Sequence, residues 1–138
     1  MKNSWKWALG LMVSGLLVLG LMSCSQYEDN ESVSLVSKTE RISQAWRVQS
    51  YSVDSLVVTP LMVGYKETFT KEGAYSFQWE LLGGTGSWAF QNGSAEVKIT
   101  NVNNVTSRTL TILRLETGAF WYYYMDGDVR TEVHLIPQ

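Results

Sequence analysis

The segment Phe69-Thr-Lys-Glu-Gly-Ala-Tyr-Ser-Phe-Gln-Trp79 decides the fold of this chain. Its centre, Lys71-Glu72-Gly73, is typical of a three-residue hairpin loop with glycine in the left-handed position. Such a loop places Phe69 opposite Tyr75. Because side chains alternate along a strand, four aromatic residues then share one face: Phe69, Tyr75, Phe77 and Trp79. The segment therefore predicts an antiparallel hairpin with an aromatic inner face.

Three further turn signals extend this pattern along the chain. Asn92-Gly93 is a strong two-residue hairpin signal, and it aligns Trp88 with Val97. Glu116-Thr117-Gly118 and Asp126-Gly127 join the last three strands in the same way. The predicted register brings eight more side chains into the interior: Leu110, Ile112, Phe120, Tyr122, Tyr124, Val129, Val133 and Leu135. Independent turns thus predict one common apolar interior, which is stronger evidence than any single propensity.

The chain after residue 45 consists of short segments rich in Val, Thr and aromatic residues, separated by glycine turns. This spacing is typical of a β-sandwich or barrel. We expect a helix of two turns over Lys38–Ala45, which lacks Gly and Pro. We expect eight strands, joined as an antiparallel meander, near residues 46–54, 65–70, 74–80, 86–91, 95–100, 107–115, 119–125 and 128–136.

Several motifs together resemble the lipocalin-like domains of bacterial surface lipoproteins. After the short helix come Trp46 at the start of the first strand, Phe69–Tyr75, Gly86-Ser87-Trp88 and Ile112-Leu113-Arg114-Leu115. The resemblance covers residues 38–138 and implies an all-β fold, an eight-stranded antiparallel up-and-down barrel with a short N-terminal helix. It also implies a non-enzymatic protein that binds a small apolar or amphipathic ligand. Closure into a barrel removes the free edges of an open meander.

The aromatic interior is the first candidate ligand site. An eight-stranded barrel is just wide enough to be filled by side chains or to hold one small ligand. The sequence leaves both alternatives open, although Gln44-Ala45-Trp46, in place of the Gly-x-Trp of the wider lipocalin group, argues against a deep transport pocket. The candidate ligand-binding residues of the barrel are Phe69, Tyr75, Phe77, Trp79, Trp88, Phe90, Tyr122 and Tyr124.

The connection of residues 55–64 is the second candidate. It carries no charge and six large aliphatic residues, although surface loops are usually polar. Leu61 and Met62 then act either as a lid over the barrel mouth or as an apolar tip that contacts a membrane or a partner. The alternative interpretation is structural, with the loop serving only as the plug of the barrel.

The outer face of the last strands is the third candidate. The register that buries Tyr122 and Tyr124 directs Trp121 and Tyr123 outward, beside Leu113 and Leu115. Exposed apolar surface of this kind often marks an interaction site, here for a protein or a glycan. The alternative is that the helix of residues 38–45 packs over this face.

The first 23 residues have the layout of a secretory signal peptide. Lys2 and Lys6 precede an apolar run over residues 8–22, and Ser23-Cys24 follows. This ending resembles the lipobox of bacterial lipoproteins, which implies that Cys24 is lipidated. A lone cysteine excludes an intramolecular disulfide. An uncleaved apolar anchor and a plain cleaved signal remain as alternatives.

Residues 24–37 are polar and serine-rich, which predicts a lipidated flexible tether between the anchor and the barrel. An acidic cluster of Glu28, Asp29 and Glu31 follows Cys24. It resembles a surface-export signal of some Gram-negative anaerobes, or it is a solvated linker with chance acids. We expect a protein of the cell envelope, anchored to the outer membrane on its periplasmic face or at the cell surface.

Composition and motifs exclude several functions. Removal of Lys2 and Lys6 leaves nine basic against thirteen acidic residues, so nucleic acid is an unsuitable partner. His134 stands alone without a second His or a Cys to complete a metal site. Asp126 and Asp128 flank a turn glycine and form no glycosidase pair. No phosphate loop, catalytic triad or cofactor motif is present, so we expect neither an enzyme nor a cofactor.

Overall fold

The computed structural model describes residues 35–138 with the exception of residue 104. The predicted signal peptide, Cys24 and most of the predicted tether therefore lie outside the described residues. The elements, in chain order, are α1 (Lys38–Ile42), β1 (Ala45–Val53), β2 (Leu56–Val57), the 3-10 helix η2 (Thr59–Met62), β3 (Lys66–Phe69), β4 (Ala74–Trp79), β5 (Leu82–Gln91), β6 (Glu96–Val102), β7 (Val105–Glu116), β8 (Ala119–Asp126) and β9 (Val129–Pro137).

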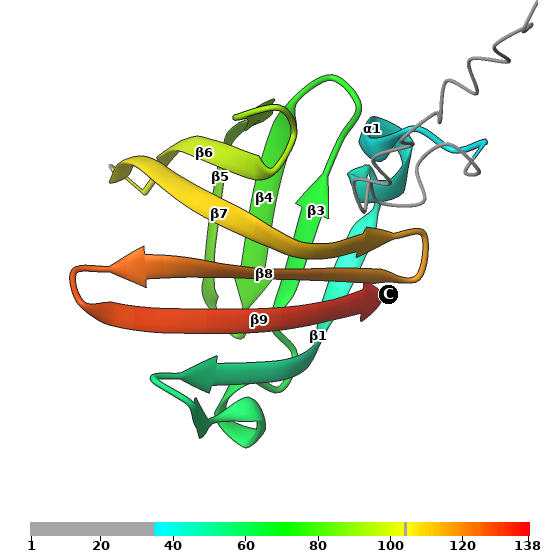
Figure 1. Cartoon of the computed structure of the whole chain (residues 1–138). Coiled ribbons are helices and arrows are strands. Elements are labelled where there is room, and N and C mark those ends of the chain that lie inside the picture. Colours follow the sequence, from blue (N-terminus) through cyan, green and yellow to red (C-terminus); the bar gives the residue numbers. More distant parts are fainter. Residues whose placement is uncertain (1–34, 104) are drawn as a thin grey trace, which may run out of the picture. The chain divides into compact units, whose positions relative to one another are not determined.

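Eight of the strands form a closed antiparallel barrel (Figure 1). Each strand from β3 to β9 pairs with its neighbour in sequence, and β1 pairs with both β3 and β9 to close the sheet. The short β2 adds a two-residue ribbon to the end of β1. The expected meander, with its N-terminal helix, is therefore confirmed.

We name the two ends of the barrel by their connections. The helix end carries α1 and the connections at residues 70–73, 92–95 and 117–118, whereas the loop end carries those at residues 54–65, 80–81 and 127–128. In Figure 1, α1 lies at the end where β3 runs into β4, and β2 and η2 lie at the opposite end.

The helix is shorter than expected and ends at Ile42 rather than Ala45. It begins with a capping box, in which Ser37 Oγ accepts from the Glu40 backbone N–H and the Glu40 carboxylate accepts from that of Ser37. It ends early because Ala45 pairs with Thr68 on β3 and is therefore the first residue of β1. The Arg41 guanidinium donates to the Leu115 carbonyl at 2.9 Å, which fixes α1 at the helix end.

Trp46 connects this helix to the core. Its side chain is fully buried, and its indole N–H donates to the Ile42 carbonyl at 2.9 Å. Its ring lies 5.8 Å from that of Phe120, centre to centre. Phe69 in turn lies 5.6 Å from Phe120 and 5.7 Å from Trp88. Tightly packed aromatic rings thus fill the helix end of the barrel.

The predicted hairpin of residues 69–79 is confirmed, because Phe69 pairs with Tyr75 and Gly73 adopts the left-handed conformation at φ +88°. The next predicted register is wrong: Trp88 pairs with Ile99, not Val97. The connection is a four-residue loop, since Asn92, Gly93 and Ser94 all have positive φ. The two-residue shift leaves every side chain on its predicted face, because the strand period is two.

Three further expectations at strand ends are corrected. β5 begins at Leu82, earlier than residue 86, and its Gly84 and Gly86 face Phe77 and Tyr75 across the β4 pairing. Val129 is 39% exposed rather than interior, because it begins β9 at the loop end. Leu115 is buried rather than outward, because a bulge between Ile112 and Arg114 reverses the alternation in β7.

The glycines of β5 let neighbouring side chains pack closely. A Cβ on Gly84 would lie 2.7 Å from Phe77 Cε1 and 2.9 Å from Val102 Cγ1. A Cβ on Gly86 would lie 2.6 Å from Val102 Cγ2 and closer still to the Thr100 carbonyl. Side chains from β4 and β6 therefore occupy the interior space that β5 leaves open.

Candidate functional site

A buried carboxylate lies in the middle of the barrel interior. Glu67 on β3 is 2% exposed, and its carboxylate accepts three hydrogen bonds from tyrosine hydroxyls. Oε1 accepts from Tyr65 at 2.8 Å and from Tyr75 at 2.7 Å. Oε2 accepts from Tyr122 at 2.9 Å. We refer to these four residues as the Tyr–Glu67 cluster; it joins β3, β4, β8 and the residue before β3.

Burial controls the protonation of this cluster. Desolvation raises the pKa of Glu67, while the hydroxyl donors and the charge of Arg108 act in the opposite direction. Burial, followed by the nearby Glu67 charge, also raises the pKa of Tyr65, Tyr75 and Tyr122. The tyrosine hydroxyls therefore stay protonated and donate hydrogen bonds to the Glu67 carboxylate. Their hydroxyl oxygens retain acceptor capacity.

A second polar layer lies nearer the loop end. The hydroxyls of Tyr51 and Tyr124 are hydrogen-bonded at 3.0 Å, and burial raises the pKa of Tyr51. The Arg108 guanidinium lies 4.3 Å from the centre of the Tyr124 ring, within the range of a cation–π interaction. Tyr65 links this layer to the Tyr–Glu67 cluster, since its ring lies 6.2 Å from that of Tyr51.

Exposure of the interior rings changes along the barrel axis. Trp46, Phe69 and Phe120, at the helix end, are at most 1% exposed. Tyr51 and Tyr124, toward the loop end, are half-buried although they pack against the core. Trp46, Phe69 and Phe120 are therefore fully buried at the helix end, whereas the rings of Tyr51 and Tyr124 are partly exposed toward the loop end.

The predicted ligand-binding residues of the barrel all belong to strands β3, β4, β5 and β8, but they divide into two groups by burial. The buried group belongs to the core: Phe69, Tyr75, Trp88 and Tyr122. The half-buried group is Phe77, Trp79, Phe90 and Tyr124. Of these, Phe90 lies next to the 92–95 connection at the helix end, away from Tyr51 and Tyr124 at the loop end.

The 55–64 connection is a short ribbon followed by a 3-10 turn, and its aliphatic side chains are at the surface. Leu61 is 69% exposed and Val63 73%, whereas Met62 is half-buried. Leu56 and Val57 on β2 are 68% and 64% exposed. These four aliphatic side chains therefore do not fill the barrel.

The outer aromatic residues are held by neighbouring polar side chains. Trp121 on β8 lies between Arg114 on β7 and His134 on β9 in the register, and its ring is stacked on His134 at 4.1 Å. Arg130 lies 3.8 Å from the centre of the Tyr123 ring. Arg41 of α1 donates to the Leu115 carbonyl near the end of β7 rather than contacting the Trp121 side chain.

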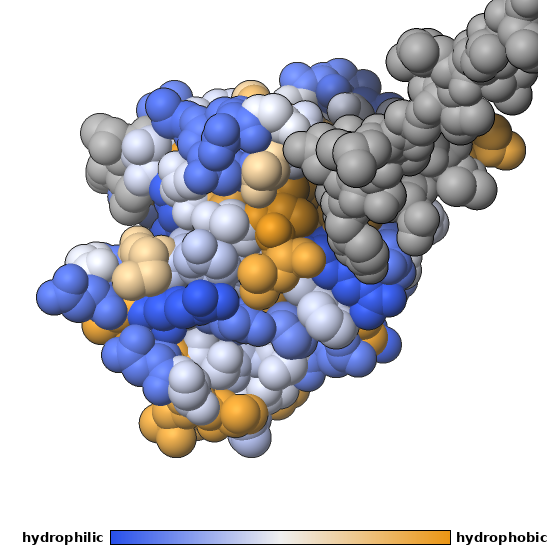
Figure 2. Space-filling view, in the orientation of Figure 1, coloured by the Kyte–Doolittle hydropathy of each residue, from blue (hydrophilic) through white to orange (hydrophobic). Residues whose placement is uncertain are grey.

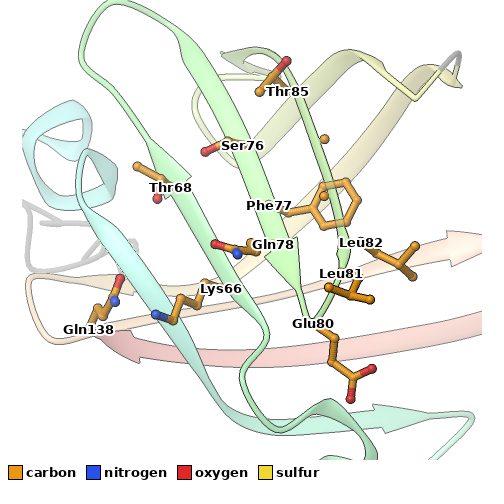
Figure 3. A pocket seen from close by; sticks show the side chains of 12 residues that line it. Lys66, Thr68, Ser76, Phe77, Gln78, Glu80, Leu81, Leu82, Thr85 and Gln138 are labelled. Atoms are coloured by element: carbon orange, nitrogen blue, oxygen red, sulfur yellow. The ribbon is translucent and has the colours of Figure 1, made fainter.

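A hollow lies over β3, β4 and β5 (Figure 3). Its volume is about 480 Å³, and its lining includes the polar side chains of Lys66, Thr68, Ser76, Gln78 and Gln138. Leu81 and Leu82 border it at the β4–β5 turn. Lys66 and Thr68 alternate with the inward-facing Glu67 on β3. Phe77 also lines this hollow, and its ring is stacked on that of Tyr65 in the Tyr–Glu67 cluster, 6.3 Å away between ring centres.

No group of three His, Cys, Asp or Glu side chains within residues 35–138, residue 104 apart, is arranged to hold a metal ion. No helix in this part of the chain is long and apolar enough to cross a membrane.

Sequence reasoning missed Glu67, Tyr51, Tyr65 and Arg108. Alternation backward from Phe69 places Glu67 and Tyr65 on the inner face, so a signal for these two was present. Tyr51 follows a bulge between Val48 and Ser50, and such bulges reverse the inner and outer faces without a clear mark in the sequence.

Comparison with known proteins agrees with this architecture. No protein-family model matches the chain, and no curated protein sequence matches it significantly. Among solved structures, a lipocalin-like protein from Bacteroides uniformis ATCC 8492 is similar, with a TM-score of 0.54 and 12% identity. The match covers 71% of this chain and 99% of that one. The chain is thus an all-β protein with a lipocalin-like fold, and at this identity the likeness concerns the fold alone.

Proposed function

We propose that this protein is a lipid-anchored envelope protein that binds a small amphipathic molecule inside the barrel, without catalysis. One observation carries the proposal of a ligand site. Trp46, Phe69 and Phe120 are fully buried at the helix end, whereas half-buried rings lead from the loop end to the Tyr–Glu67 cluster. Apolar walls with a few convergent polar groups are the usual composition of a ligand site.

The Tyr–Glu67 cluster forms the polar floor of the proposed site, and its hydrogen bonds favour a particular chemical group on the ligand. The three hydroxyl hydrogens of Tyr65, Tyr75 and Tyr122 are donated to Glu67, so the floor offers oxygen lone pairs and a buried negative charge. Such a floor favours a hydrogen-bond donor, above all an amine, over a carboxylate. The apolar part of the ligand then contacts the rings of Phe77 and Tyr124.

The ligand proposal is tested with three compounds that share one alkyl chain: octylamine, octanol and octanoate. Isothermal titration calorimetry with the mature chain should give the tightest binding for octylamine, about tenfold tighter than for octanoate. Glu67→Gln should remove this preference. Glu132→Gln is the matched control, because Glu132 bonds His134 on the outer face. Equal affinities for the three compounds, or a preference that survives Glu67→Gln, would contradict the proposed floor.

The anchor part of the proposal rests on the sequence alone. Ser23-Cys24 after an apolar run supports cleavage before Cys24 and acylation of its sulfur and amine, with palmitate or a similar acyl chain. Mass spectrometry of the N-terminus decides the matter. An intact Met1, or an unmodified Cys24, would contradict the anchor without affecting the ligand site.

A further inference from the structure

Eight of the eleven exposed large aliphatic side chains of the described residues lie at the loop end of the barrel, whereas Leu35, Val36 and Leu113 lie elsewhere. The 54–65 connection carries four of them, and the β4–β5 and β8–β9 turns carry two each. In this group, which we call the aliphatic rim, are Leu56, Val57, Leu61, Val63, Leu81, Leu82, Met125 and Val129. All are at least 39% exposed, and Leu81 is completely exposed. Figure 2 shows part of the rim as the hydrophobic area where β2 and η2 lie in Figure 1.

The arrangement of the aliphatic rim is better suited to contact with a lipid bilayer than with a flat protein surface. Its side chains belong to three separate connections of the loop end. Exposed acidic residues stand between or beside them at the turns: Asp54, Glu80, Asp126 and Asp128. A bilayer interface takes up such separated aliphatic side chains individually, and it lets neighbouring charges remain at the headgroups. The acidic turns disfavour an anionic surface, so a zwitterionic phospholipid is the matching partner.

The length of the predicted tether permits this contact. The thirteen residues between Cys24 and Lys38 span on the order of 45 Å when extended. β7, the longest strand with twelve residues, spans about 40 Å. The tether joins the barrel at α1, on the helix end, and is therefore long enough for the loop end to reach the membrane that holds the anchor.

We propose that the aliphatic rim docks on a zwitterionic phospholipid surface and turns the mouth of the barrel toward the bilayer. The proposal rests on the lipid anchor and ligand site of the proposed function. An amphipathic ligand then passes between the bilayer and the barrel interior with little exposure to water. The rim thus gives the half-buried rings at the loop end a direct source of ligand.

The test uses the full lipidated chain in phosphatidylcholine vesicles, with one introduced cysteine per variant. Because Cys24 is the only native cysteine and its sulfur is acylated, only the introduced thiol takes up an environment-sensitive fluorophore. Leu61→Cys and Leu81→Cys place it on the rim. Gly118→Cys is the matched control, exposed at the helix end with no atom near a Cβ. Brominated lipids should quench the fluorescence of the label at residues 61 and 81 at least twofold more than that of the label at residue 118.

Each other result has a defined meaning. Equal quenching at the three positions overturns the docking proposal. A second result is that the fluorophore at the rim positions is shielded from water but is not quenched by brominated lipids, and that this shielding rises with protein density. This result overturns the docking proposal in favour of contact between two copies of the chain. If the unaltered chain takes up the fluorophore at Cys24, the anchor has failed. Flotation of that unlipidated chain with the same vesicles then tests the docking directly. If the chain binds the vesicles and Leu61→Asp weakens this binding, docking by the aliphatic rim is supported. If the chain does not bind the vesicles, the docking proposal is overturned.

Discussion

Replacement of Tyr122 by Phe tests the Tyr–Glu67 cluster most sharply. Among the described residues, Glu67 Oε2 has one donor, the Tyr122 hydroxyl at 2.9 Å, and both side chains are at most 2% exposed. The variant therefore leaves one carboxylate oxygen buried without a protein donor. A hydrogen bond to a charged group contributes about 1.5–3 kcal/mol, so we expect a loss of about 2 kcal/mol of unfolding free energy. Urea denaturation measures this loss.

Tyr124→Phe is the matched control on the same strand and face. Its hydroxyl bonds the neutral Tyr51 hydroxyl in a half-buried position, so a loss of at most about 1 kcal/mol is expected. The difference between the two variants should shrink at low pH, because a protonated Glu67 no longer requires a donor at each oxygen. Equal losses for the two variants, or a Tyr122→Phe loss that is the same at about pH 4 and about pH 8, would refute the reasoning.

Further predictions concern charge, packing and the anchor. Because burial raises the pKa of Glu67, the folded state binds the Glu67 proton more tightly than the unfolded state does. The free energy of unfolding should therefore fall as the pH rises above the usual carboxyl range. Urea denaturation at a series of pH values should show this fall for the wild-type chain but not for Glu67→Gln. Gly86→Ala should destabilise the barrel by about 1–3 kcal/mol in thermal unfolding, because its Cβ meets the β6 backbone, whereas Gly118→Ala, with open space, should be near neutral. Trp46→Ala should cost about 3–5 kcal/mol by the same measurement, since the ring is fully buried. Cys24→Ala should abolish metabolic lipid labelling while circular dichroism shows an unchanged β spectrum, because the substitution lies outside the barrel.

The turn chemistry predicted most of the fold. Lys71-Glu72-Gly73 requires glycine at positive φ, and Gly73 has it, so the register of β3 and β4 followed from the sequence. Asn92-Gly93 was less informative, because Ser94 also adopts positive φ and lengthens the loop by two residues. Because the register shift is two residues, the inward-facing side chains of β5 and β6 were still assigned correctly.

The site was harder to predict because it depends on contacts between distant strands and on bulges. Glu67 is separated from Tyr122 by 55 residues, and a charged residue on an aromatic face is expected to face solvent unless its partners are known. The bulge between Val48 and Ser50 hides the inward position of Tyr51. The bulge in β7 likewise moves Leu115 into the core and leaves Leu113 46% exposed. Bulges break the two-residue period, which is the main signal that a sequence offers for strands.

Native mass spectrometry of the full chain, purified gently from its own cell, tests the central claim most directly. The account predicts a discrete small-molecule adduct on the wild-type chain and on Glu132→Gln, and its loss from Glu67→Gln. Added octylamine serves as the positive control for retention of a bound ligand in the instrument. A wild-type chain that carries no adduct while octylamine is retained, or an adduct that persists in Glu67→Gln, would contradict a ligand site built on the Tyr–Glu67 cluster.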